Sequence, residues 1–176
     1  MNILLGVTGG IAAYKSCELC SLAIKNGHDV IAVMTESATR FVGTITFEGL
    51  TGNKVYTDNF ETAMDHINLA KWADVVIVAP LTANSLAKIA GGLCDELLFT
   101  VLCATPTKTP VLLCPAMNTH MWNSPITQRN LKLLEETERY TIQSPVEKRL
   151  ACGDFGVGGL PEPTSILKEC ERICRG

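Results

Sequence analysis

The loop Pro115–Trp122, with the sequence P-A-M-N-T-H-M-W, gathers several side chains that can take part in chemistry. Asn118 offers an amide that donates hydrogen bonds to a carboxylate without forming an ionic bond to it. Met121 and Trp122 offer the soft apolar surface that often lines ligand pockets. The same residues also suit a turn followed by core or interface packing, so the loop by itself leaves both interpretations open.

Small and hydroxyl-bearing residues fill three other loops, each directly after an apolar run: Thr8–Gly10, Thr35–Thr39 and Pro80–Ser85. Glycines in such a loop let the backbone approach a phosphate, and the following helix supplies unpaired N–H groups. The first loop follows neither the G-x-G-x-x-G nor the Walker A pattern, so it specifies neither a dinucleotide nor ATP. Each loop alone also suits a tight turn or a helix cap. The three together predict a site for a mononucleotide phosphate and its sugar chain.

His66 and Cys152 are the candidates for proton transfer. A histidine titrates close to neutral pH and can act as a base there, although a single histidine at a helix start is also a common cap or surface residue. Cys152 precedes the polar, glycine-rich run Gly153–Gly159, whereas structural cysteines prefer apolar surroundings. We expect this run to be a mobile lid that excludes water from a site.

The other cysteines read as structural residues. Cys94, Cys103 and Cys114 lie in apolar runs and are expected to be buried. Cys17 and Cys20 form a C-x-x-C pattern inside a predicted helix, and no second pair of metal ligands has matching spacing. We therefore expect two residues on one helical face and no metal site.

The elements that must position these residues alternate along the chain. The predicted strands are Asn2–Val7, Asp29–Met34, Asp74–Ala79, Pro110–Cys114 and Tyr140–Ser144. The predicted helical segments are Ile11–Asn26, Ser37–Val42, His66–Trp72, Thr82–Ala90, Asp95–Ala104, Pro125–Glu138 and Ser165–Arg175, and Val55–Glu61 is ambiguous. This alternation predicts an α/β, Rossmann-like (flavodoxin-like) three-layer sandwich with a mostly parallel sheet. All four loops then fall beyond the carboxyl ends of strands, where ligands of such sheets bind.

Composition limits the class of protein. The chain has 176 residues, of which 47% are hydrophobic and 19% are charged, and we expect one globular domain over 1–176. A net charge of −3 without a basic run makes nucleic acid an unexpected partner. No apolar stretch approaches the ~20 residues that span a bilayer, and no secretory leader precedes the first strand-like run. We expect a cytoplasmic protein that does not enter a membrane.

The motifs together resemble those of the homo-oligomeric flavin-containing cysteine decarboxylases, nearly from end to end. The segments that carry the resemblance are G-G-I-A-A-Y-K from Gly9, M-D-H-I around His66, W-A-D-V-V-I-V-A-P-L-T-A-N-S-L-A-K-I-A-G-G-L-C-D from Trp72, P-A-M-N-T-H-M-W from Pro115 and K-R-L-A-C-G-D-F-G-V-G-G-L-P-E-P from Lys148. The pattern P-x-M-N-x-x-M-W followed by A-C-G-D is specific for this family. One departure is Gly159, where some relatives have Arg or Ala.

The resemblance implies FMN as the cofactor and a set of residues around it. The residues that would hold FMN are Gly9, Gly10, Ile11, Thr35, Ser37, Phe41, Thr82, Ala83, Asn84, Ser85 and Ala116. His66 would be the active-site base, and Asn118 would hold the substrate carboxylate in a pocket that Met121 also lines. A clamp over the substrate would contain Arg149, Leu150 and Ala151 and carry Cys152 as proton donor. Members of the family form homotrimers or multiples of trimers, with the flavin at a subunit boundary.

The implied reaction removes CO2 from the cysteine carboxylate of 4′-phospho-N-pantothenoylcysteine and yields 4′-phosphopantetheine, a step of coenzyme A synthesis. Direct loss of CO2 would leave a carbanion at Cα with nothing to accept its electrons, whereas oxidation of the neighbouring CH2–SH places a C=S beside it. No side chain accepts a hydride, so this route needs a flavin.

Three alternatives stay open: an oxidative decarboxylase of a peptidyl C-terminal cysteine, a flavin-binding regulatory subunit, and a flavodoxin-like electron carrier. Cys152 favours the full cycle, because the peptidyl enzyme stops at the enethiol and needs no proton donor for reduction. The regulatory subunits carry acidic tails; the printed sequence contains no such acidic run, so we do not expect this role.

Overall fold

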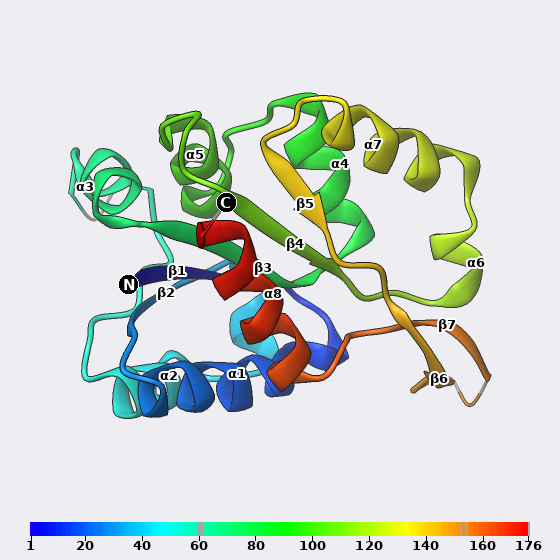
Figure 1. The fold of residues 1–176 in the computed structure, drawn as a ribbon, viewed down its shortest axis with the longest axis horizontal. Helices are drawn as coiled ribbons and strands as arrows, with labels where there is room; N and C mark the ends of the chain where they lie inside the picture. The colour runs from blue at the N-terminus through cyan, green and yellow to red at the C-terminus, as the bar shows by residue number, and fades with distance from the viewer. Residues whose placement is uncertain (60–61, 152, 154, 176) are drawn as a thin grey trace.

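A five-stranded parallel sheet forms the centre of the molecule (Figure 1). The computed structural model describes residues 1–59, 62–151, 153 and 155–175. The strands are β1 (Asn2–Val7), β2 (Asp29–Met34), β3 (Val75–Leu81), β4 (Val111–Pro115) and β5 (Tyr140–Ile142), in the order β2-β1-β3-β4-β5. The chain first adds β2 on one side of β1 and then crosses to β3 on the other side. This reversal creates a switch point between β1 and β3, which is where doubly wound sheets of this order bind ligands.

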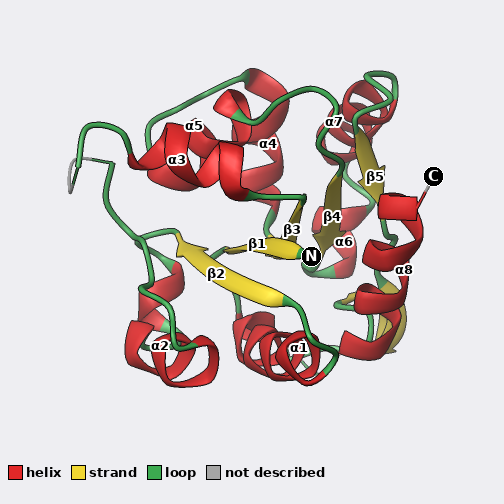
Figure 2. Cartoon of the chain, turned by 60° about the vertical axis from the view of Figure 1, so that its left-hand side comes forward, coloured by secondary structure: helices red, strands yellow, loops and turns green. Residues whose placement is uncertain are grey.

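Helices cover both faces of the sheet (Figure 2). One face packs against α1 (Tyr14–Lys25), α2 (Thr44–Thr51) and α8 (Pro163–Arg175); the other packs against α3 (Asp65–Trp72), α4 (Ala83–Gly91), α5 (Leu97–Ala104) and α7 (Pro125–Glu135). Alternate residues of β1 serve the two cores, since Ile3 and Leu5 join the first and Leu4 joins the second. Among the described residues, no helix is long and apolar enough to cross a membrane.

The predicted α/β sandwich and its five strands are therefore confirmed, with boundary shifts of one or two residues. The first predicted helix begins as a short 3₁₀ turn, η1 (Ile11–Ala13), and the segment Ser37–Val42 contains another, η2 (Ala38–Arg40). The ambiguous Val55–Glu61 segment contributes a single parallel bridge between Tyr56 and Val33.

Three elements escaped prediction: α2, the single turn α6 (Thr119–Trp122), and an antiparallel hairpin of β6 (Val146–Arg149) and β7 (Phe155–Gly159). The T-I-T-F-E-G-L-T sequence of α2 is rich in β-branched residues, which have low helix propensity, but burial of Phe47 fixes it. The hairpin has no hydrophobic alternation to predict it, because β7 is F-G-V-G-G.

The run Gly153–Gly159 was expected to be a mobile lid. Phe155–Gly159 is a strand whose glycines allow it to pack against α6 and the preceding loop, and the movement of this segment stays a prediction. One expectation was wrong. Cys94 and Cys103 are exposed in the chain, because Cys94 lies in the loop before α5 and Cys103 lies on the outer face of that helix. Cys114 is buried as predicted.

Candidate active site

Three loops lie at the carboxyl ends of β1, β2 and β3, and we call them together the cradle: Thr8–Gly10, Thr35–Ser37 and Thr82–Ser85. Thr8 holds the first and third loops together. Its Oγ1 donates to the Pro80 carbonyl oxygen over 2.7 Å and accepts the Thr82 backbone N–H over 3.0 Å. Thr8 is fully buried, so both bonds are shielded from water. Sequence reasoning assigned Thr8 no role, although a threonine directly after a buried strand was the available signal.

The second loop lies against the glycines of the first. A Cβ atom built on Gly9 would lie 2.7 Å from the Ser37 backbone carbon, so no larger residue fits there without movement. The hydroxyls of Thr35 and Ser37 lie 3.1 Å apart, and Thr35 Oγ1 also accepts the Ala38 N–H over 3.3 Å. Thr35 is buried, whereas Ser37 is exposed. Gly9 is therefore required for the close approach of two loops.

Thr82 is the N-cap of α4. Its Oγ1 accepts the Ser85 N–H over 3.2 Å and lies 3.0 Å from Ser85 Oγ. The helix-cap interpretation of this loop is thus correct, and it does not compete with a ligand site. The cap fixes the first turn of α4, with Ala83 partly buried and Asn84 exposed.

The cradle presents neutral hydroxyl, amide and backbone N–H groups. The sequence-predicted residues that lie in it or on its edge are Gly9, Gly10, Ile11, Thr35, Ser37, Thr82, Ala83, Asn84 and Ser85. Two helical segments begin at the cradle, at Ile11 and Ala83, and the start of a helix offers backbone N–H groups to an anion. Phe41 follows η2 and is 50% exposed. Glu36 is the single carboxylate of the cradle loops, and it is exposed to solvent. The remaining neutral donors suit a phosphomonoester joined to a polyol chain.

The loop after β4 borders the cradle. The Ala116 N–H donates to the Leu81 carbonyl over 3.0 Å, which fixes this loop to the end of β3. Asn118 is the N-cap of α6, and its Oδ1 accepts the His120 N–H over 2.8 Å. This cap holds the side chain of Asn118 in one orientation, while Met121 is 49% exposed beside it. His120 is exposed.

The β6–β7 hairpin packs against the same loop. The Met117 N–H donates to the Gly158 carbonyl over 3.0 Å, and a Cβ on Gly158 would overlap the Met117 carbonyl oxygen. A Cβ on Gly156 would lie 2.7 Å from Thr119 Oγ1. The predicted clamp residues lie at the hairpin's far end, with Arg149 and Ala151 exposed and Leu150 partly buried. Cys152 lies outside the described residues.

His66 is not close to these groups within one chain. It lies in the first turn of α3, partly buried. Figure 1 places α3 and α6 at opposite ends of the molecule's longest axis, and Figure 2 also separates them. A single chain therefore does not bring His66 and Asn118 together, and sequence reasoning could not reveal this because the distance between two elements depends on how they pack.

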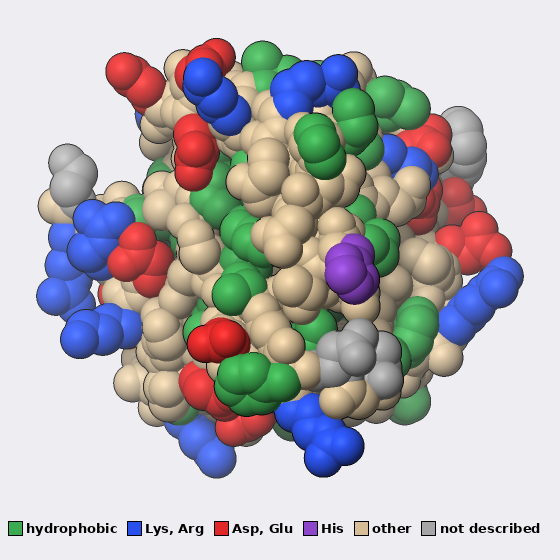
Figure 3. All heavy atoms as spheres, turned by 90° about the vertical axis from the view of Figure 1, so that its right-hand side faces the viewer, with side chains coloured by type: hydrophobic (Ala, Val, Ile, Leu, Met, Phe, Trp, Pro, Cys, Tyr) green, Lys and Arg blue, Asp and Glu red, His purple; other side chains and the backbone are tan. Residues whose placement is uncertain are grey.

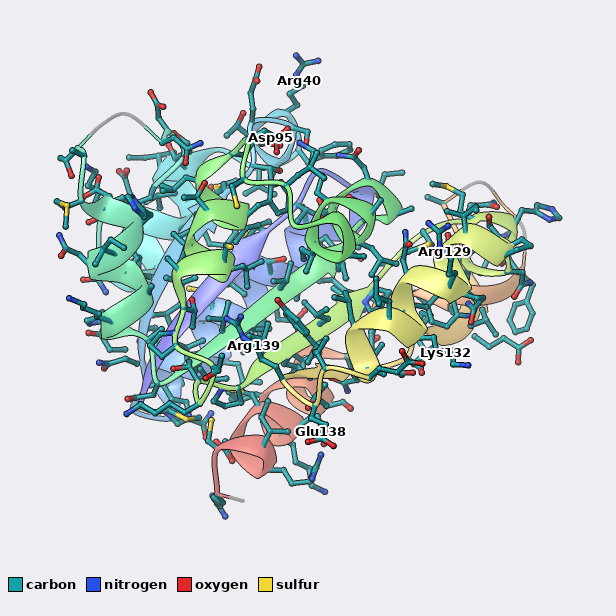
Figure 4. The ribbon with its side chains drawn as sticks, turned by 90° about the horizontal axis from the view of Figure 1, so that it is seen from above. Arg40, Asp95, Arg129, Lys132, Glu138 and Arg139 are labelled. Carbon is teal, nitrogen blue, oxygen red and sulfur yellow. The ribbon has the colours of Figure 1, made fainter. Side chains whose placement is uncertain are left out.

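An ionic network braces the second cradle loop from outside. Glu96 Oε2 accepts the Glu36 N–H over 3.0 Å, and Lys88 Nζ lies 2.8 Å from Glu96 and 2.7 Å from Asp95. Burial lowers the pKa of Lys88, but its hydrogen bonds to Asp95 and Glu96 raise it above its usual value. The hydrogen bond from Lys88 in turn lowers the pKa of Asp95. Figure 4 shows Asp95 in the same corner of the molecule as Arg40 of η2.

The chain was compared with models of known protein families, and one of them matches almost all of it. The flavoprotein family model matches residues 1–174, and the chain belongs to this family.

Two curated relatives are similar over almost the whole chain. The coenzyme A biosynthesis bifunctional protein CoaBC of Bacillus subtilis is 45% identical over 175 residues, which are 97% of this chain and 42% of that protein. A probable phosphopantothenoylcysteine decarboxylase of Arabidopsis thaliana is 43% identical over 174 residues, covering 94% of this chain and 84% of the relative. The chain thus spans less than half of the bifunctional relative and most of the plant one.

Solved structures agree with the fold. A mutant PPC decarboxylase in complex with pantothenoylaminoethenethiol has a TM-score of 0.88 at 37% identity, and the match covers 99% of this chain and 98% of that one. The FMN binding protein AtHal3 has a TM-score of 0.85 at 39% identity, with 98% and 95% covered.

Proposed function

We propose that this flavoprotein is a cytoplasmic FMN-dependent decarboxylase that converts 4′-phosphopantothenoylcysteine to 4′-phosphopantetheine. The observation that carries this proposal is the placement of Asn118, oriented by its cap at the edge of a neutral hydroxyl cradle. The relatives that match nearly the full chain, and the complex with an aminoethenethiol, support the same reaction class. Because the chain covers only 42% of the bifunctional relative, we propose for it the decarboxylation alone and no other activity of that longer protein.

The residues present fit FMN. The phosphate would lie at the helix start beside Gly10 and Ile11, with the hydroxyls of Thr35 and Ser37 near it. The side of the cradle toward Asn118 is bordered by Thr82, Asn84 and Ala116. These residues would hold the flavin ring of FMN. When bound, FMN supplies the electron acceptor that the CH2–SH group needs and later returns the same electrons, so no external reductant is consumed.

Each protein group then has a limited task. His66 assists removal of the thiol proton near neutral pH. Asn118 holds the carboxylate through amide N–H groups, and this neutral contact leaves departure of CO2 unopposed by a fixed cation. Cys152 donates the proton that completes the saturated carbon. The hairpin excludes water by closing over Asn118 with Arg149–Ala151.

A homotrimer would complete the site. His66 lies far from Asn118 in one chain, so a second copy must deliver its α3 to the cradle. Exposed apolar residues near the cradle include Ile11, Tyr14, Phe41 and Ile45, with exposed fractions of 63%, 60%, 50% and 73%. Figure 3 shows apolar side chains on the side of the molecule that carries α6 and the hairpin. The exposed apolar residues of these two elements include Met121 and Phe155. So many exposed apolar side chains around one site favour an interface between two copies of this chain.

The reaction is tested by mass spectrometry of products after the FMN-loaded protein is incubated with 4′-phosphopantothenoylcysteine. We expect release of CO2 and formation of 4′-phosphopantetheine without added reductant. Cys152→Ser should instead accumulate the unsaturated thiol, which is two hydrogens lighter than 4′-phosphopantetheine. A wild-type protein that releases the unsaturated thiol with reduced flavin would be the peptidyl-cysteine type of enzyme, and one that releases no CO2 would refute the proposal.

The shared site is tested by mixing two inactive variants. His66→Asn and Asn118→Ala each remove one half of the same site, so either protein alone should lose turnover. Co-expressed chains should regain activity, because some boundaries combine an intact His66 with an intact Asn118. Complete inactivity of the mixed oligomers, verified by mass to contain both chains, would show that both residues act from one chain.

A further inference from the structure

Two lysines and one glutamate meet where the β6–β7 hairpin joins the body of the protein. Lys15, in the first turn of α1, places its Nζ 2.7 Å from Glu162 Oε1. Lys148, on β6, donates from its Nζ to the Leu160 carbonyl oxygen over 3.2 Å. The side chain of Lys15 is largely buried at 12% exposed, whereas that of Glu162 is 64% exposed, so the lysine is fixed in place and the carboxylate remains open to solvent. In sequence, Lys15 follows the Gly9–Gly10 loop of the cradle by five residues.

The cluster carries an excess of positive charge. Two ammonium groups share one carboxylate, and among the described residues no carboxylate forms an ion pair with Lys148. Burial lowers the pKa of Lys148, the neighbouring Lys15 lowers it further, and the charge of Glu162 offsets only part of this, so the net shift of the pKa is downward. Burial also lowers the pKa of Lys15, but the hydrogen bond and charge of Glu162 together raise it above its usual value. Two like charges this close are unfavourable unless an anion joins them.

Gly159 makes the position of Lys148 possible. A Cβ on Gly159 would overlap the end of the Lys148 side chain and lie 2.7 Å from its Cδ and Cγ. The lysine therefore lies flat across the glycine and turns its ammonium toward Lys15 and Glu162, instead of extending into solvent. The residues that follow Lys148 are Arg149–Ala151, the segment proposed to close over the substrate.

We propose that Lys15 and Lys148 form the subsite for the phosphomonoester end of the substrate, with Glu162 as a competing anion that the phosphate displaces. This inference rests on the proposed function and names the residues that select the phosphorylated substrate. A phosphomonoester dianion neutralises both ammonium groups, which Glu162 alone does not. Phosphate binding here also pulls on β6, so the charged end of the substrate helps to hold the hairpin over its reacting end.

The test compares kcat/KM for phosphopantothenoylcysteine and for pantothenoylcysteine, which lacks the phosphate. Lys148→Met should lower the ratio of the two values about tenfold, because one charge-assisted contact is lost. Lys148→Arg should restore most of the ratio. Glu162→Gln should raise it, because the competing carboxylate is gone. Lys132→Met is the matched control, since Lys132 is exposed on α7 away from the site and should leave the ratio as in wild type (Figure 4).

The phosphate of FMN is the other source of the same chemistry. The dissociation constants for FMN and for riboflavin, which lacks the phosphate, show whether the lysines bind the phosphate of the cofactor. If they bind the substrate phosphate instead, Lys148→Met should leave the ratio of these two constants unchanged. Selective loss of FMN affinity would assign the lysines to the cofactor and overturn the proposal. An equal loss of kcat/KM for both substrates would show a structural role and also overturn it.

Binding measurements separate this inference from the reaction itself. Titration calorimetry with 4′-phosphopantetheine and pantetheine should show a preference for the phosphorylated compound that Lys148→Met removes. That preference without turnover would refute the proposed reaction and leave the subsite. Turnover of both substrates with equal kcat/KM in the wild type would refute the subsite and leave the reaction.

Discussion

The cradle and the β6–β7 hairpin border the same site, but they are held in different ways. The cradle loops each emerge from a central strand, and buried hydrogen bonds from Thr8 join the first to the third. The hairpin forms its own two-stranded sheet, and its contacts with the body include the Met117–Gly158 backbone bond and the lysine cluster at its base. Both regions depend on glycines, since Gly9 admits Ser37 and Gly158 admits Met117.

The difference indicates a division of labour. A cradle fixed to the sheet binds its ligand with little reorganisation, which suits a resident cofactor. A hairpin held at its base and through its contacts with the loop before α6 and with Thr119 lies outside the main sheet, so we expect it to move without disturbing the core, which suits a substrate that must enter and leave. Variants at the two glycines should therefore separate cofactor binding from substrate turnover.

The largest effect is expected for Gly9→Ala. The new methyl group would lie 2.7 Å from the Ser37 backbone carbon and would force the first two cradle loops apart. Overpacking of this kind costs up to about 3 kcal/mol, so FMN affinity should fall on the order of 100-fold. Fluorescence titration of the apoprotein with FMN measures it. Gly43→Ala is the control, because its Cβ would lie at an ordinary 3.8 Å from Ile45; an unchanged affinity in Gly9→Ala would contradict the rigid cradle.

Gly158→Ala should act on the hairpin and spare the cofactor. Its Cβ would overlap the Met117 carbonyl oxygen, so β7 must withdraw from α6. We expect kcat/KM to fall roughly 10- to 30-fold while the purified protein keeps its full flavin content. Steady-state kinetics and the flavin-to-protein absorbance ratio give both values. Gly49→Ala, which has open space around its Cβ, should behave as wild type. Parallel loss of flavin and activity would mean that the two regions are not independent.

The smallest effect concerns the ionic brace behind the cradle. The folded-state pKa of Asp95 is lowered by Lys88, so its contribution to stability is present above the unfolded value of 3.8 and is lost as pH falls below it. Asp95→Asn should lower the melting temperature at pH 7 by about 1 °C, since Asp95 is exposed and solvent screens its attraction to Lys88. The difference from wild type should disappear as the pH falls through the lowered folded-state pKa of Asp95, where the carboxyl gains its proton. Calorimetric melting at pH 7 and in acid measures this, and a difference that persists in acid would show that the effect is not electrostatic.

Sequence patterns predicted the parallel sandwich and the cradle's loops because both follow from local order. Apolar runs such as Val75–Leu81 define buried strands, and parallel strands place their carboxyl ends at one edge. The hydroxyls of Thr35 and Thr82 directly follow such runs and were therefore found. The hairpin was missed because F-G-V-G-G has no alternation, and its glycines are explained by neighbours about forty residues earlier in the chain, Met117 and Thr119.

The order of amino acids is enough to establish which residue types stand at the strand ends, and thus the class of ligand that they can hold. Which of them meet depends on how the chain folds in three dimensions. Thr8 joins Pro80 and Thr82 across more than seventy residues, Lys15 reaches Glu162, and α3 carries His66 away from Asn118. The physical reason is that hydrogen bonds and ion pairs act over a few ångströms between groups far apart in the chain. Local propensity therefore cannot specify them until the sheet order is set.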